Sequence, residues 1–298
     1  CAWAAERRQD EARDEESGAQ EMSTIDTSRG GVGAIATWQR IYAMILRHLY
    51  ILRGSWPRLL DLAYWPTVQM IMWGFMSQFL SGQTSYIAQA FGVLLSAVLL
   101  WDVLFRGQLA VSISFFEEMW SRNLGHLFVT PLRPGEFASA LLSISLLRTL
   151  LGIVPASLLA VAFFGFSVYS LGLSLAAFFF SLLMFGWAIG LGVTGLVLRH
   201  GLGAENIAWG MVFALLPVSA VYYPVSVLPV WLQYVAYAMP PAYSFEGMRS
   251  ILINGVVRYD LMAAAFALNV VYLGLGFGLF FYYFRMARRR GSLLQQGE

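Results

Sequence analysis

Six long apolar runs, separated by short polar segments, occupy most of the chain. A helix needs about 20 apolar residues to cross the ~30 Å hydrocarbon core of a bilayer, and each run reaches that length. The pattern therefore predicts an all-α integral membrane protein with six transmembrane helices. The runs are Leu59–Leu80, Ile87–Phe116, Phe137–Phe166, Leu171–Leu198, Ala204–Tyr223 and Leu261–Phe284.

The segment ahead of the first run has a different pattern. From Thr37 to Arg53 apolar residues recur at helical spacing, but Arg40, Arg47 and Arg53 interrupt them. This predicts an N-terminal amphipathic helix that lies in the membrane interface and does not span it.

Three regions follow from the distribution of polar residues. Residues 1–33 are polar and acid-rich, which is typical of a disordered N-terminal tail. Met22 resembles a natural start, so residues 1–21 are set apart as an extension. We expect a six-span membrane domain over residues 34–290 and a cytosolic C-terminal tail over residues 291–298.

The segment Val221–Gly255, before the last run, is apolar and aromatic, and Pro224, Pro229, Pro240 and Pro241 divide it into pieces too short to span. Proline-broken apolar helices of this size suit an outer hairpin whose backbone is buried in protein or lines a cavity. An aromatic belt at the membrane surface is the alternative, and both interpretations remain open. The belt residues are Tyr222, Tyr223, Trp231, Tyr234, Tyr237 and Tyr243.

Composition supports the membrane class and excludes one activity. Charged residues make up only 12% of the chain, about half the usual share in a soluble domain. All 19 basic residues are arginine, so the chain cannot form the lysine-containing phosphate-binding loop of nucleotide hydrolases. Any ATP hydrolysis must therefore occur on another polypeptide. The net charge of +2 gives no indication of a nucleic-acid partner.

The arginines also predict the orientation of the chain. If the N-terminus is cytosolic, fifteen arginines fall in inner segments, and only Arg249 and Arg258 fall in outer ones. The positive-inside rule therefore places both termini in the cytosol.

Three charged residues interrupt the second and third apolar runs: Asp102, Arg106 and Arg148. Ionisable groups in hydrocarbon are costly and usually face a bundle interior or a wet cavity. One acid between two arginines leaves a spare positive charge that could meet an anionic head group. A static network of Asp102 with Arg148 or Arg106 is the alternative.

Other candidate sites are not supported. Gly190, Gly192 and Gly195 match a dinucleotide fingerprint, but they lie inside an apolar run with no preceding strand. Together with Gly186 they are better explained by close helix packing, as are Gly274, Gly276 and Gly278 in the last run. The only cysteine is Cys1, and the three histidines lack metal-ligand spacing, so no metal site is predicted. The pattern indicates a non-catalytic chain.

A charged island, Phe116–Glu136, joins the second and third runs. Glu117 and Glu118 open it, Arg122 and Arg133 follow, and two prolines close it. A short helix-compatible segment on the cytosolic side of a membrane chain is a surface on which a soluble partner can act.

Two motifs give the chain a resemblance to a known family. The segment EEMWSRNLGHLFVTPLRPGEF, Glu117–Phe137, is similar to the charged inner loop of type-2 ABC exporter permeases, with an acidic start, Thr-Pro-Leu and then an acid. The segment YPVSVLPVWLQYVAYAMPPAYSFEGMR, Tyr223–Arg249, resembles their outer Pro-x-x-x-Leu-Pro region with its terminal arginine. In this order and on these sides of the membrane, the two motifs extend the resemblance over Thr37–Arg290.

The resemblance implies how the permease would be powered. A permease homodimer, or a dimer with a related permease, would carry two cytosolic ATPase subunits, which would supply the ATP and Mg²⁺ sites. Glu117–Pro131 would be the coupling helix in a cleft of the ATPase, and the Thr37–Arg53 helix would touch the ATPase from the side. The expected coupling residues are Glu117, Glu118, Met119, Trp120, Arg122, Leu124 and Leu127. The two acids could pair with basic groups of the ATPase, but an exposed ion pair contributes little, and shape and the apolar residues are expected to carry more of the contact.

The resemblance also implies an outer gate formed by helices Leu228–Met239 and Ala242–Leu252. The cargo would be amphipathic or lipid-like, such as a lipid-linked glycan, a glycolipid or a hydrophobic drug, exported across the bacterial inner membrane. The gate residues are Tyr222, Tyr223, Pro224, Pro229, Trp231, Pro240, Pro241, Glu246 and Arg249.

Two other function classes would give the sequence different features. An ATPase-independent secondary transporter or channel would be expected to show internal repeats or broken helices in both halves, and the chain has one broken hairpin. An integral membrane transferase would be expected to show clustered acids or histidines near one interface. Copurification with an ATPase distinguishes the three classes.

Overall fold

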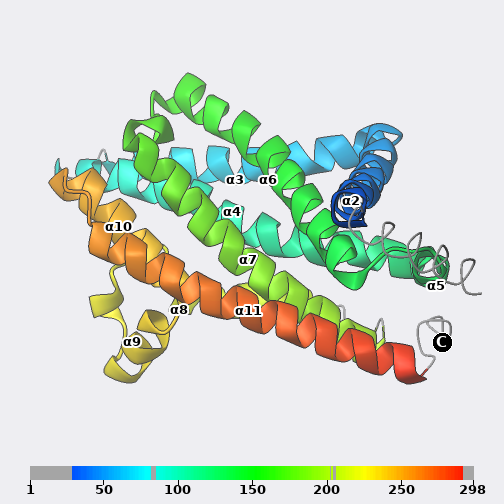
Figure 1. The fold of residues 1–298 in the computed structure, drawn as a ribbon. Coiled ribbons are helices and arrows are strands. Elements are labelled where there is room, and N and C mark those ends of the chain that lie inside the picture. Colours follow the sequence, from blue (N-terminus) through cyan, green and yellow to red (C-terminus); the bar gives the residue numbers. More distant parts are fainter. Residues whose placement is uncertain (1–28, 82–84, 202, 204–205, 291–298) are drawn as a thin grey trace, which may run out of the picture.

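A computed structural model describes residues 29–81, 85–201, 203 and 206–290 (Figure 1). The described residues are helical throughout, with short connections and no strand, which confirms the all-α prediction. The helices are α2 (Arg29–Arg53), α3 (Trp56–Ser81), α4 (Ser85–Trp120), α5 (Leu124–Val129), α6 (Pro134–Phe164), α7 (Leu173–His200), α8 (Asn206–Val218), α9 (Val230–Tyr237), α10 (Pro240–Asn254) and α11 (Tyr259–Arg290).

Four of the described helices are long and apolar enough to cross a membrane. They are Gly92–Trp120 within α4, Pro134–Phe164, Leu173–His200 and Tyr259–Arg289. They correspond to the second, third, fourth and sixth predicted spans and make the chain a multi-pass membrane protein. The six-span count is not reached by this measure.

The other two predicted spans differ from expectation. α3 has 26 residues, about 39 Å at 1.5 Å per residue, but is not among the four sufficiently apolar helices. α8 has only 13 residues, about 20 Å, because the helix ends at Val218 in a segment where the chain turns. The fifth predicted span, Ala204–Tyr223, is therefore shorter as a helix than the sequence pattern indicated.

α7 packs between α4 and α11, and small residues allow the close approach. A Cβ added to Gly190 would lie 2.9 Å from the Gln108 carbonyl oxygen on α4, and one added to Gly276 would lie 2.5 Å from the Ala188 carbonyl oxygen on α7. Gly186 and Gly195 are similarly crowded, so the packing explanation holds for these glycines. It fails for Gly274 and Gly278, which have no neighbour within 4 Å of such a Cβ, and for Gly192, which would meet only Leu279 Cδ1 at an ordinary 3.9 Å.

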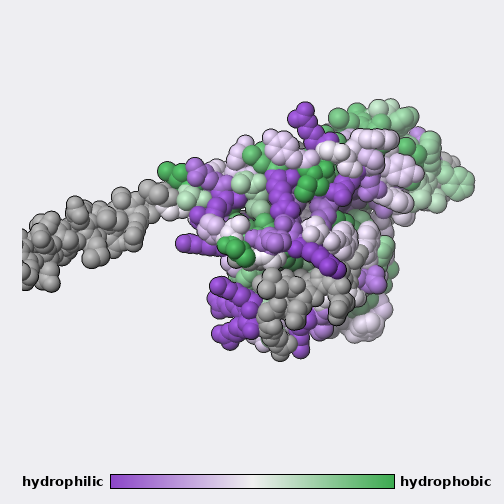
Figure 2. Space-filling view, turned by 90° about the vertical axis from the view of Figure 1, so that its right-hand side faces the viewer, coloured by the Kyte–Doolittle hydropathy of each residue, from purple (hydrophilic) through white to green (hydrophobic). Residues whose placement is uncertain are grey.

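α3 and α6 pack on α4, and α2 crosses against α6. α2, α5 and the C-terminal end of α11 lie at the same end of the molecule, at the right of Figure 1, whereas α9 and α10 lie at the left. Figure 2 views the α2–α5 end directly and shows hydrophilic side chains gathered across it. This end is called the polar end below.

The boundaries of the first helix differ from prediction. α2 begins at Arg29, eight residues before the predicted start at Thr37, so residues 29–33 are helical and do not belong to a disordered tail. The remaining tail residues, 1–28, and the predicted C-terminal tail, residues 291–298, lie outside the described residues.

Candidate functional site

The connection between α4 and α6 forms the candidate coupling site at the polar end. α4 continues to Trp120, and the chain then turns through Arg122, which has a positive φ of 53°, before α5 begins at Leu124. The predicted single helix from Glu117 to Pro131 is therefore wrong. Glu117 and Glu118 belong to the last turn of α4, and α5 itself has only six residues.

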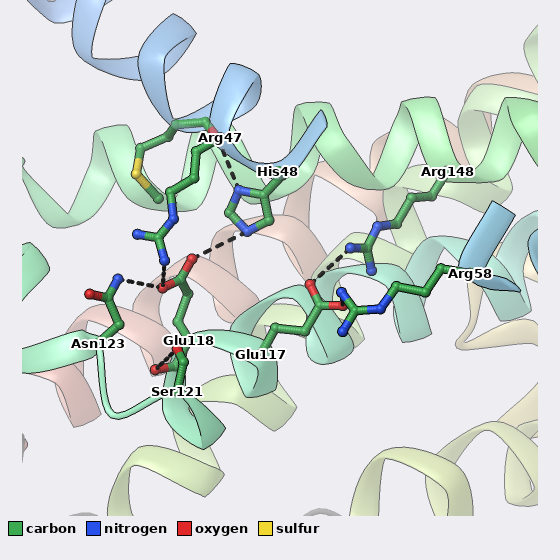
Figure 3. Close-up of polar contacts among 9 residues, drawn as sticks. Arg47, His48, Arg58, Glu117, Glu118, Ser121, Asn123 and Arg148 are labelled. Atoms are coloured by element: carbon green, nitrogen blue, oxygen red, sulfur yellow. Dashed lines mark hydrogen bonds and ion pairs between the residues drawn. The ribbon is translucent and has the colours of Figure 1, made fainter. Parts of the chain in front are cut away.

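Glu118 is 1% exposed and is surrounded by groups of its own chain (Figure 3). Its carboxylate accepts a hydrogen bond from Asn123 Nδ2 at 2.8 Å and pairs with Arg47 Nη2 of α2 at 2.9 Å. His48 Nε2 lies 3.6 Å from the other carboxylate oxygen. The His48 ring donates from Nδ1 to the Met44 carbonyl oxygen at 2.9 Å, which turns Nε2 toward Glu118.

Glu117 joins α4 to two further helices. One carboxylate oxygen accepts a hydrogen bond from Arg148 Nη2 of α6 at 2.9 Å, and the other lies 3.5 Å from Arg58 Nη1 at the start of α3 (Figure 3). Together, Glu117 and Glu118 connect α4 to α2, α3 and α6. We call this set the acid junction: Arg47, His48, Arg58, Glu117, Glu118, Asn123 and Arg148.

The acid junction changes the expected role of the two acids. Carboxylates at the C-terminal end of a helix are disfavoured by the helix dipole, so their position in α4 requires nearby cations. The chain supplies those cations from α2, α3 and α6. The expectation that Glu117 and Glu118 face basic groups of a partner is therefore corrected, because their carboxylates pair within the chain.

The other expected coupling residues divide into a buried and an exposed set. Met119 and Leu124 are each 2% exposed and pack in the core of the α4–α5–α6 junction. Trp120 is 50% exposed, Arg122 is exposed and Leu127 is half-buried.

Val129, at the end of α5, is 86% exposed and was missed from the sequence. It ends the short apolar helix α5, directly before Thr130 and Pro131. Its exposure depends on how α5 packs against the other helices, which the local pattern does not reveal.

A second ion pair fastens α2 beside the acid junction. Arg40 donates to both carboxylate oxygens of Glu136, at 2.8 and 2.6 Å. This hydrogen bonding raises the pKa of Arg40 above its usual value. Glu136 also accepts from the Arg133 backbone N–H at 2.9 Å and so caps the start of α6.

Sequence reasoning missed the role of Glu136, although a signal existed. Arg40 and Arg47 are two helical turns apart and therefore share one face of α2. The two arginines reach acids on either side of the α4–α6 connection.

The three intramembrane charges do not form one triad. Arg106 Nε donates to Asp102 at 2.6 Å within α4, which is one of the two contacts considered in the static alternative. Arg148 pairs with Glu117 and not with Asp102. The inferred spare positive charge is corrected, because Glu117 supplies a second acid that the sequence pattern had assigned to the inner loop.

The expected gate residues include a compact polar clamp. Arg249 is buried and donates to the carbonyl oxygens of Ala220 at 2.9 Å and Val221 at 3.2 Å. Glu246 accepts from Arg249 at 3.2 Å and from the Val225 backbone N–H at 2.8 Å. Ala220 has a positive φ of 51°, which is uncommon for a residue with a side chain. Arg249 and Glu246 therefore hold a strained turn between α8 and α9.

The remaining gate residues surround that turn on different sides. Tyr222 stacks on Trp73 of α3 with ring centroids 5.0 Å apart, and the Tyr223 hydroxyl donates to the Pro217 carbonyl oxygen at 2.6 Å. Pro240 and Pro241 are buried at the start of α10. The exposed members are Pro224, Pro229 and Trp231.

The expected two-helix hairpin is present as α9 and α10.

Metal chemistry finds no support in the described part of the chain, where no group of three potential ligands lies together. His48 belongs to the acid junction. His200 Nδ1 lies 3.1 Å from the Leu196 carbonyl oxygen of its own helix, and His126 lies on the exposed side of α5.

The all-helical fold and its apolar spans define a polytopic membrane protein, and the α4–α6 connection is partly exposed at its polar end. Residues 43–253, well over half of the chain, match the model of the ABC-2 type transporter family, and the chain belongs to that family. It is thus an ABC-2 permease, the membrane subunit of an ABC transporter. The match runs from α2 to α10 and leaves α11 outside it. A comparison with curated proteins finds no match.

Proposed function

We propose that this permease is the membrane half of an ATP-driven exporter and that a separate cytosolic ATPase docks on α5. The observation that supports this proposal most directly is the exposed surface of the α4–α6 connection. Trp120, the last residue of α4, and Val129, the last residue of the six-residue α5, present apolar surface at the polar end. Exposed aromatic surface beside polar residues is typical of a protein contact.

The acid junction connects the proposed docking surface on α5 to the long helices of the membrane domain. Force on α5 reaches α4 through a tight turn, and Glu118 links that turn to α2 through Arg47. Glu117 links the same point to α3 and α6. Binding and hydrolysis of ATP by the partner can shift the permease between states only by as much as the partner binds those states differently. Stimulation of ATP hydrolysis by cargo is the expected signature.

The remaining parts of the proposal concern assembly and cargo. Two permeases, as a homodimer or with a related permease, pair with two ATPase subunits, which hold ATP and Mg²⁺. The polar end and both termini face the cytosol of a bacterial cell, and six spans cross its inner membrane. The cargo is amphipathic or lipid-like, in keeping with an apolar, aromatic outer hairpin.

Copurification tests the docking assignment. A tagged permease is coexpressed with a candidate ABC ATPase and extracted in mild detergent, and bound ATPase is quantified. Trp120→Asp and Val129→Asp together are expected to abolish binding while the permease remains in the membrane. Leu124 is unsuitable, because its burial would confuse loss of docking with loss of folding.

Trp231→Asp is the matched control, since Trp231 is 68% exposed on α9, far from the polar end. Its ATPase binding is expected to equal that of the wild type. Undiminished ATPase binding by the Trp120→Asp/Val129→Asp variant would refute docking on α5.

A further inference from the structure

A cavity of about 450 Å³ lies among α3, α4, α6 and α8. This volume falls in the usual range for small-molecule sites. One part of its wall is apolar and aromatic and includes Phe105, Trp209 and Phe213. The other part carries ionisable and hydrogen-bonding side chains: Asp61, Gln69, Asp102, Arg106 and Arg148. The cavity therefore suits a molecule with one polar and one apolar part.

Except for the exposed Asp61, the charges in and behind this wall are paired with one another. Arg106 contacts Asp102 at 2.6 Å, and Arg148 contacts Glu117 at 2.9 Å. Glu117 also lies 3.5 Å from Arg58, while the Asp61 carboxylate accepts a hydrogen bond from Trp65 Nε1 at 3.1 Å. Two acids and two arginines thus line the cavity, and their formal charges cancel.

This cancellation disfavours a charged occupant. A charged group that leaves water for a site of low dielectric needs an opposite charge there. The opposite charges in this cavity are already engaged, so an anion would have to displace Asp102 from Arg106 or Glu117 from Arg148. Inside the cavity a cation would have to displace Arg106 from Asp102. At the edge it would meet Asp61, an exposed carboxylate, where an ion pair contributes little.

Neutral hydrogen-bonding groups face no such competition. A guanidinium has five N–H donors, and the Arg106 contact to Asp102 runs through Nε alone. Arg148 is only 5% exposed, and its Nε has no hydrogen-bond partner among the described residues. A hydroxyl or amide oxygen could accept from these donors without separating either ion pair.

We infer that the cavity receives the polar head of the cargo and that this head is uncharged, with hydroxyl or amide groups, joined to an apolar chain. The inference rests on the proposed function for the word cargo, but binding in the cavity does not require an ATPase. Asp102 and Arg106 then determine specificity for an uncharged head, because each neutralises the charge of the other. The proposal replaces the anionic head group that the sequence alone suggested.

Binding to the purified permease tests the inference without a partner. Three dioleoyl lipids that share their chains are used as probes: a glucosyl diacylglycerol, a phosphatidylglycerol and a trimethylammonium-propane lipid. Each is titrated in nonionic detergent, and quenching of tryptophan fluorescence by a brominated analogue reports occupancy near Trp65 and Trp209. The glucosyl lipid is expected to bind about tenfold more tightly than either charged lipid, a difference of about 1.4 kcal/mol.

Two variants test the neutralisation directly. Asp102→Asn leaves Arg106 without its acid and is expected to shift preference toward the anionic lipid by about tenfold. Arg106→Gln is expected to shift preference toward the cationic lipid. The double variant, which removes both charges, is expected to regain the wild-type order.

Tighter binding of a charged lipid by the wild type would overturn the inference even if every variant failed to fold. Unchanged preferences in folded Asp102→Asn and Arg106→Gln proteins would overturn the role of this ion pair. A preference for the neutral lipid without any copurifying ATPase would support the cavity and refute the proposed function. ATPase docking with a charged preference would do the reverse.

Discussion

Arg148 of α6 reaches Glu117 at the end of α4, with 2.9 Å between the Arg148 Nη2 and Glu117 Oε2 atoms. This contact joins a residue from the middle of one apolar run to an acid from the charged segment beyond another. Arg148 is thereby neutralised at the edge of the cavity, and Glu117 is withdrawn from the surface available to a partner. The Arg148–Glu117 ion pair thus joins α4 to α6. It also leaves neither charge free, so Glu117 is not available to a partner at the α4–α6 connection and Arg148 is not available to an anion in the cavity.

Replacing Arg148 by leucine is expected to destabilise the permease by about 3 kcal/mol. The change leaves Glu117 without its close cation, and removal of one partner from a buried pair is strongly unfavourable. Thermal unfolding in detergent measures the loss. Adding Glu117→Gln should restore part of the stability, because the uncompensated charge is then gone. Arg258→Leu is the control, since its pair with Asp260 is exposed and is expected to contribute little to stability. Equal losses for Arg148→Leu and Arg258→Leu would contradict the structural role of Arg148.

Two glycine substitutions separate packing from helix propensity. In Gly190→Ala the new methyl group would lie 2.8 Å from Val111 Cβ and 2.9 Å from the Gln108 carbonyl oxygen, so α7 must move away from α4. We expect a loss of about 1–3 kcal/mol, as for other overpacked cores. Gly278→Ala meets nothing within 4 Å and should be neutral or stabilising by up to about 1 kcal/mol, because alanine favours a helix. Unfolding midpoints compare the two, and a Gly190→Ala protein as stable as Gly278→Ala would be inconsistent with the α4–α7 contact.

Loss of the Arg249 clamp is expected to loosen the turn between α8 and α9. Cys1 is the chain's only cysteine, so a Cys1→Ser protein carrying Val225→Cys has a single reporter at a fully buried position. Arg249→Met removes charged hydrogen bonds to Ala220 and Val221 and should raise the maleimide reaction rate at that reporter about tenfold. Arg258→Met, at an exposed arginine, should leave the rate unchanged. No acceleration in the Arg249→Met protein would show that the turn is held by other contacts.

The orientation can be tested with the same single-cysteine approach. Val129→Cys at the polar end and Trp231→Cys on α9 are both well exposed positions. In intact cells an impermeant maleimide should label Trp231→Cys and leave Val129→Cys unlabelled until the membrane is opened. The reverse labelling would contradict the proposed orientation, in which the polar end faces the cytosol.

Periodicity and composition were sufficient for much of the fold. The four most apolar helices, the α9–α10 hairpin and the family itself follow from run length, proline position and two short motifs. The limits of α2 and α8 did not follow, because helix ends depend on tertiary contacts as well as on local pattern. α2 is extended N-terminally by residues without a strong helical signal. α8 ends at Val218, just before the two carbonyl oxygens, of Ala220 and Val221, that accept hydrogen bonds from Arg249, a residue 31 positions beyond Val218.

The connection between α4 and α6 could be located from the sequence, but the contacts of its two acids could not. Two adjacent acids in a charged loop suggest a surface, and nothing local reveals that Arg47, Arg58 and Arg148 from three other helices converge on them. Those partners lie 31 to 71 residues away in the chain, so their pairing is set by helix packing. The same long-range packing buried Leu124, exposed Val129 and removed the spare charge inferred for Arg148.

Transport in sealed vesicles tests the central claim most directly. The permease is reconstituted with its ATPase and a glucosyl diacylglycerol, and the appearance of the lipid in the opposite leaflet is followed with and without ATP. We expect movement only when ATP and ATPase are both present, and none with the Trp120→Asp/Val129→Asp permease. Equal rates without ATPase, or with the docking surface altered, would contradict the account.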